Sequence, residues 1–149
     1  MVDEVLREAR TLLGAMTPVG NTAAFAVTAP ANPPTSWDST AGAAAGAAVT
    51  TLDGQLTHLQ HAHQAVAAAI AEANEITRNA HTQLNAVENT WASDRAAAEP
   101  GADTTETQGA LLQAAHHHIN DITAVVQAAA EQFQTAAARI AAAAAALPH

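Results

Sequence analysis

The sequence predicts an all-α fold built on a long antiparallel two-helix hairpin that packs like a coiled coil. Alanine, the strongest helix former, is the commonest residue. Two apolar series step alternately by three and four residues, which keeps each series on one side of an α-helix. The first ladder is Val49, Leu52, Leu56, Leu59, His63, Val66, Ile70, Ala73, Thr77, Ala80, Leu84, Val87 and Trp91. The second ladder is Leu112, Ala115, Ile119, Ile122, Val126, Ala129, Phe133, Ala136, Ile140, Ala143 and Leu147.

A short amphipathic helix is expected at the N-terminus, over residues 1–17, followed by a Pro-rich linker over residues 18–36. Four of the six prolines lie in this linker, and proline-rich segments favour extended conformations. The apolar face of the short helix is expected to consist of Val5, Ala9, Leu12 and Met16, with Leu6 and Leu13 beside it.

The hairpin itself is expected over residues 37–147, with its helices at about 37–98 and 104–147. Pro100 and Gly101 end the first helix, because proline and glycine together interrupt helical structure. The connection is short, so the second helix should return antiparallel to the first.

The start of the second helix carries a variant of the capping box, formed by Asp103 and Glu106. In an antiparallel hairpin with this turn, residues facing each other have numbers that sum to roughly 200. Trp91 is therefore expected opposite Leu111 and Leu112.

The start of the first long helix, residues 39–53, is expected to extend past the end of the second. Either the N-terminal helix covers this stretch or a partner protein does. Gly42, Gly46 and Gly54 recur on one side of the same helix. Each glycine costs about 1 kcal/mol relative to alanine in a helix interior. We expect another backbone to approach these three residues closely, which makes them candidate interaction residues.

The two tryptophans complete the candidate interaction site. Trp37 is expected at the start of the first long helix, where it either anchors the linker or contacts a partner. Trp91 ends the first ladder and either plugs the open end of the hairpin or forms a recognition feature there.

Charge and composition exclude several classes of function. The net charge is −9, from 14 acidic and five basic residues. No basic patch is available to displace counterions from nucleic acid, so no nucleic-acid partner is expected, and binding to an anionic membrane is disfavoured for the same reason. The acidic N-terminus does not resemble a Sec signal peptide, and no segment is apolar enough to span a bilayer. The absence of cysteine excludes disulfides.

No enzymatic, cofactor-binding or metal-binding residues are predicted. The sequence contains no nucleophile motif, phosphate-binding loop or carboxylate pair, so the chain is expected not to be an enzyme and to need no cofactor. Eight histidines are present, most of them in two groups. We interpret them as polar residues of the surface and of the edges of the seam, by which we mean the contact between the two long helices. A less favoured alternative is a metal site formed by His81 and His118 across the seam.

A tryptophan near the turn of an acidic, alanine-rich hairpin resembles the WXG100-like superfamily of type VII (ESX) secretion substrates of mycobacteria. The Trp-x-Gly motif of that family corresponds here to Trp91, Ala92 and Ser93, so serine stands in place of glycine. The run from Thr35 to Asp38 also resembles the start of actinobacterial secretion-associated helical domains of unknown function. The similarity covers residues 35–147.

The resemblance implies a non-enzymatic protein that acts through helix-helix association, with itself or with a protein partner. It also implies that the protein is secreted or placed in the cell envelope by a Sec-independent route. The chain departs from the family in its greater length and in lacking the Tyr-x-x-x-Asp/Glu export signal, since it contains no tyrosine. Its ending is consistent with the N-terminal domain of a longer protein. The alternatives are a cytoplasmic coiled-coil adaptor and a phasin-like protein that coats apolar surfaces.

Overall fold

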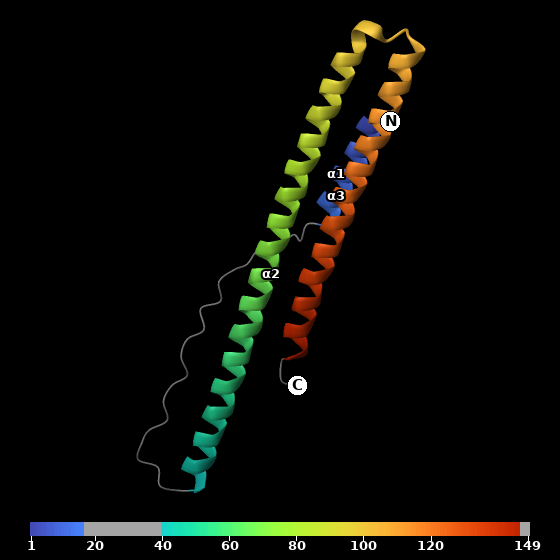
Figure 1. Cartoon of the computed structure of the whole chain (residues 1–149). Coiled ribbons are helices and arrows are strands. Elements are labelled where there is room, and N and C mark those ends of the chain that lie inside the picture. Colours follow the sequence, from blue (N-terminus) through green and yellow to red (C-terminus); the bar gives the residue numbers. More distant parts are fainter. Residues whose placement is uncertain (17–39, 147–149) are drawn as a thin grey trace. The chain divides into compact units, whose positions relative to one another are not determined.

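A computed structural model of the chain describes residues 1–16 and 40–146, and nearly all of these residues lie in helices (Figure 1). The helices are α1 (Val2–Met16), α2 (Thr40–Ala98) and α3 (Thr105–Ala145), and the short 3-10 helix η1 (Glu99–Gly101) follows α2. No strand occurs in the described part of the chain, and α2 and α3 pack against each other. The predicted all-α class is therefore confirmed. The predicted linker and Trp37 lie outside the described residues.

The end of α2 lies where the sequence predicts it, at Ala98, directly before the Glu99–Gly101 segment. Pro100 falls inside η1, where it occupies one of the first two positions and needs no backbone N–H bond. Farther back, α2 passes through Asp53 and Gly54 as uninterrupted helix. The glycine there does not break the helix.

The cap of α3 differs from the prediction. The backbone N–H of Thr107 donates to Oγ1 of Thr104 at 3.2 Å, so Thr104 is the N-cap residue. A second hydrogen bond spans the same turn: the side-chain amide of Gln108 donates to the backbone carbonyl of Ala102 at 3.1 Å. The Asp103–Glu106 capping box is therefore wrong by one residue, because the helix begins at Thr105.

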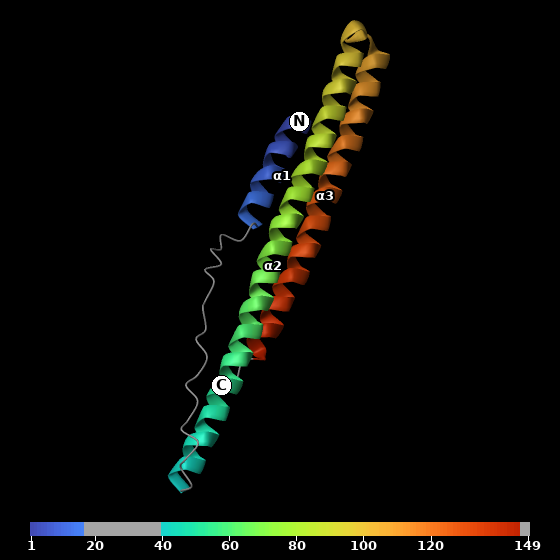
Figure 2. The same cartoon turned by 90° about the vertical axis from the view of Figure 1, so that its left-hand side faces the viewer.

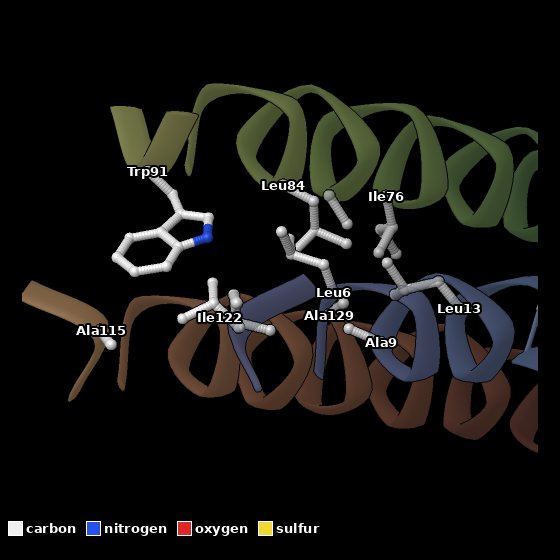
Figure 3. Packing of buried hydrophobic residues seen from close by; sticks show 11 residues of the cluster. Leu6, Ala9, Leu13, Ile76, Leu84, Trp91, Ala115, Ile122 and Ala129 are labelled. Carbon is white, nitrogen blue, oxygen red and sulfur yellow. The ribbon is translucent and has the colours of Figure 1, made fainter. Parts of the chain in front are cut away.

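The chain divides into two compact units: unit 1 comprises Met1–Val19 and Ala71–Ala136, and unit 2 comprises Gly20–Ile70 and Ala137–His149. In unit 1, all three helices contribute to a single hydrophobic core (Figure 3). Its buried members are Val2, Leu6, Ala9 and Leu13 of α1, Ile76, Ala80, Leu84 and Trp91 of α2, and Ala115, Ile122 and Ala129 of α3.

The N-terminal helix α1 lies alongside α2 within unit 1 (Figure 2). Its buried stripe is Val2, Leu6, Ala9 and Leu13, with Leu12 and Met16 exposed. The predicted face is therefore wrong by a rotation of the helix about its axis. The observed stripe turns two leucines inward and places a small alanine between them, which allows close helix packing.

Polar contacts also join α1 to α2 within unit 1. Arg10 donates to Oδ1 of Asn85 at 2.7 Å and to Oε2 of Glu88 at 2.5 Å. Asp3 accepts from Arg95 at 3.5 Å. The interpretation that α1 covers residues 39–53 is therefore wrong, because its apolar stripe and its polar contacts are both used within unit 1.

The adjacent leucines of α1 provide a matched stability test. Leu13 is 0% exposed and Leu12 is 44% exposed. We expect Leu13→Ala to lower the free energy of unfolding by about 2–5 kcal/mol, because it leaves a cavity between three helices. Leu12→Ala should cost less than about 1 kcal/mol. Urea unfolding followed by circular dichroism measures both values, and equal losses would contradict the position of α1.

Candidate functional site

The three glycines singled out by the sequence all lie on α2 in unit 2. Gly42 and Gly46 are half-buried and Gly54 is exposed. A Cβ atom added at Gly46 or at Gly54 would meet nothing within 4 Å. Within the described part of the chain, the expected close approach of another backbone is therefore absent at these two positions.

Trp91 lies in unit 1 and belongs to its core. The residue is 8% exposed, and its ring packs edge-on against that of His118, with centroids 5.8 Å apart and planes inclined by 63°. The guanidinium of Arg95 lies 6.0 Å from the centre of the indole, within the range of a cation–π contact. This burial favours a packing role for Trp91 over direct recognition of a partner.

His118 is the buried polar residue of the core, with 4% of its surface exposed. Its Nε2 atom lies 2.7 Å from Oδ2 of Asp94, a hydrogen bond that joins α3 to α2. On the other side of the ring, Nδ1 lies 3.9 Å from Oδ2 of Asp121. A buried imidazole without a partner is costly, so the bond to Asp94 satisfies a group that the fold has taken out of water.

The sequence pattern predicts a place for His118 at the flank of the seam and does not indicate its pairing with Asp94. A signal was available, because His118 follows Ala115 by three residues and precedes Ile122 by four, which places all three on one stripe. The alternative that pairs His118 with His81 is not what the structure shows, since the imidazole faces Asp94 and Trp91.

The register of unit 1 also differs from the prediction that facing residues sum to roughly 200. Trp91 and Asp94 both reach His118, so these contacts lie several residues farther along α3 than expected. Helical side chains lean toward the N-terminus of their own helix. In packed helices of opposite direction, side chains on α2 lean away from the turn and those on α3 lean toward it, which shifts their meeting points.

The polar cluster around His118 does not have the properties of a reactive site. The imidazole side chain is 5% exposed, so a substrate has no access to it. Among the residues that the structure describes, no three histidine or acidic side chains converge as a metal ion requires. The cluster acts instead as a polar clamp between α2 and α3.

A surface of different character lies on α2 in unit 2. No residue between Thr40 and Ala68 is buried. Leu52 and Leu59 of the first ladder are each 54% exposed. The half-buried Val49 and Leu56 complete an apolar strip on one side of the helix. We call Val49, Leu52, Leu56 and Leu59 the leucine face.

The leucine face interrupts the burial of the first ladder. The pattern continues from unit 1 into unit 2 without a missing step, yet burial does not continue with it. Two exposed leucines seven residues apart, with a third between them, form the kind of seam that another helix covers.

None of the described helices is long and apolar enough to cross a membrane. No family model, no curated protein and no solved structure matches this chain. The resemblance to type VII secretion substrates therefore stays an expectation.

The polar clamp predicts a difference between two aspartates that face the same imidazole. Asp94 and Asp121 have similarly exposed side chains, at 42% and 41%, but lie 2.7 Å and 3.9 Å from His118. We expect Asp94→Ala to lower the free energy of unfolding by about 1–3 kcal/mol, because it leaves Nε2 buried without a partner. Asp121→Ala should cost less than about 1 kcal/mol. Chemical unfolding at pH 7 compares them, and a larger loss for Asp121→Ala would count against the clamp.

Proposed function

We propose that the chain is a non-enzymatic type VII secretion-associated protein that acts through helix-helix association, with itself or with a protein partner. Its architecture in this proposal is an antiparallel, coiled-coil-like hairpin over residues 37–147, preceded by the short helix and the Pro-rich linker. The observation that carries the proposal is the leucine face, an apolar strip on a helix that has no fully buried residue from Thr40 to Ala68.

The leucine face supports association of modest strength. Complete burial of a leucine side chain is worth about 1.5–3 kcal/mol, and Leu52 and Leu59 each have 54% of their surface left to bury. Two protein surfaces that associate first lose at least about 4 kcal/mol of translational and rotational freedom. Burial of the exposed parts of both leucines, worth about 1.6–3.2 kcal/mol, does not offset this cost, so a partner must also contact the smaller residues around them.

The small residues beside the leucines favour such close contact. Alanine and glycine make up most of α2 between Thr40 and Ala48. Around Gly46 the space that a Cβ would occupy is open, so an incoming backbone can approach there. Gly54 is equally open but lies on the opposite side of α2 from the leucine face. In this proposal Gly46 leaves room for a partner helix, and Trp91 serves the packing of unit 1 that supports α2.

Export is the second part of the proposal and rests on the resemblance. Trp91, Ala92 and Ser93 stand where the family has Trp-x-Gly, and the acidic N-terminus does not resemble a Sec signal. The proposed location is outside the cytoplasm or in the cell envelope. The alternative is a cytoplasmic coiled-coil adaptor that uses the same leucine face.

Association through the leucine face has a matched control in Leu112, which is also 54% exposed but lies in unit 1. We expect Leu52→Gln combined with Leu59→Gln to weaken association at least about 10-fold, because two apolar contacts are lost. Leu112→Gln should change it less than about 2-fold. Sedimentation equilibrium of the chain, alone and with its genomic neighbours as purified proteins, measures the constants. Equal effects of the two changes would exclude the leucine face as the contact.

Export is tested with a tagged full-length chain in a mycobacterial host, with and without a functional type VII secretion ATPase. We expect the protein in the culture filtrate or envelope fraction only when the ATPase works. A cytosolic marker protein controls for lysis. Equal extracellular amounts in both strains, or a protein confined to the cytosol in both, would exclude type VII export and favour the adaptor.

A further inference from the structure

We infer that α1 carries a second docking surface, which binds a helix of a different protein that places a lysine or arginine among apolar residues. This surface is separate from the leucine face, so the inference goes beyond the proposed function. All of the residues that form it belong to unit 1.

A row of exposed apolar side chains runs along α1 beside its buried stripe. Leu12 and Met16 are 44% and 39% exposed, and Met1, directly before the helix, is 64% exposed. Val5 is half-buried. At about 100° per residue, these four side chains lie within roughly 60° of one another around the helix axis. We call Met1, Val5, Leu12 and Met16 the outer row, and their exposure leaves it open to a partner.

The carboxylate of Glu8 lies in the middle of the outer row. Glu8 follows Val5 by three residues and precedes Leu12 by four, so it lies on the same side of the helix. Its side chain is exposed and forms no hydrogen bond or ion pair with the residues that the structure describes. A helix that covers the outer row therefore also covers Glu8. Removing a carboxylate from water without a partner is costly, so the covering helix must supply a positive charge.

The contact between α1 and α2 shows the same requirement already met. Oδ2 of Asp3 lies 3.5 Å from Nη1 of Arg95, and Oε2 of Glu88 accepts a hydrogen bond from Arg10 at 2.5 Å. Both carboxylates thus face an arginine on the opposite helix. At the outer row the carboxylate of Glu8 is present without such an arginine, which indicates a basic residue on the helix that docks there.

The rest of this chain offers no suitable basic residue. The chain contains no lysine and five arginines. Two of these arginines lie on α1 itself, and the two on α2 pair with acidic residues of unit 1. Arg139 of α3 takes part in another interaction. The leucine face supplies no positive group either, since no arginine occurs from Thr40 to Ile70.

A second copy of α1 is also a poor occupant. Parallel pairing of two outer rows places Glu8 opposite Glu8. Antiparallel pairing that matches Val5 with Leu12 makes residue 8 face residue 9, so the two Glu8 side chains again lie close together. Like charges at the centre of a small apolar contact oppose association in both directions. The occupant is therefore a helix of another protein, with apolar residues on both sides of a central lysine or arginine.

The test uses three synthetic helical peptides of about 18 residues, long enough to span α1. Their sequences are identical, with leucine on both sides of one central residue, which is lysine, glutamine or glutamate. Each peptide carries a dye, and an anisotropy titration with the full chain measures its dissociation constant. The natural chain should bind the lysine peptide at least about 10-fold more tightly than the glutamine peptide, and the glutamate peptide most weakly.

Substitution of Glu8 should change the charge preference without removing apolar surface. Glu8→Gln should reduce the preference for lysine over glutamine to less than about 2-fold, and Glu8→Lys should make the glutamate peptide the strongest ligand. Glu131→Gln removes an exposed negative charge from α3 and should leave the preference unchanged. Leu12→Gln should weaken binding of the lysine peptide at least about 3-fold. Leu52→Gln with Leu59→Gln should leave that binding unchanged.

Three results would overturn the inference. Equal affinities of the three peptides, or no binding of any of them, would show that the outer row selects no basic helix. A lysine preference that survived Glu8→Gln at full size would assign it to the negative charge of the whole chain. Loss of binding in the variant with both Leu52→Gln and Leu59→Gln would place the contact at the leucine face. Circular dichroism checks that each variant keeps its helix content, and sedimentation of the natural chain tests the leucine face separately.

Discussion

The core of this molecule depends on a third helix that supplies what two alanine-rich helices lack. The largest side chains that are fully buried are Leu6, Leu13, Leu84, Ile122 and Val2. Three of these five belong to α1, although α1 is by far the shortest of the three α-helices. A seam with alanine on many of its steps buries little apolar surface, because a methyl group is small. The leucines of α1 fill the groove between α2 and α3 and concentrate the core in unit 1.

The same constraint explains why an unbroken sequence pattern has two outcomes. Around Leu84 the first ladder is covered by α1 and α3, and its members are buried. Around Leu52 and Leu59 the ladder has the same spacing and comparable residues, yet both leucines are more than half exposed. Spacing determines which side of a helix is apolar, but burial requires a covering element. The leucine face is therefore the part of the ladder for which the described chain supplies too little cover.

The sequence predicted the helices well because their signals are local. Alanine content and the three-four spacing predicted long helices, and Pro100 with Gly101 located the end of α2 at Ala98. Features decided by packing between helices were missed. The rotation of α1 depends on the groove that receives Leu6 and Leu13, and the bond from His118 to Asp94 depends on how side chains lean in the seam. The expectation that facing residues have numbers summing to roughly 200 depends only on the position of the turn, so it contains neither of these effects.

The burial of Trp91 changes where function should be sought. A tryptophan near a chain reversal suggests a recognition feature, but this indole lies against His118 and is 8% exposed. A partner that contacted the ring would have to disrupt the polar clamp between α2 and α3, at a cost that a small interface does not recover. The leucine face imposes no such cost, because its leucines are already exposed on a formed helix. Binding there would add apolar burial without loss of core packing, so the proposed association costs least at the leucine face.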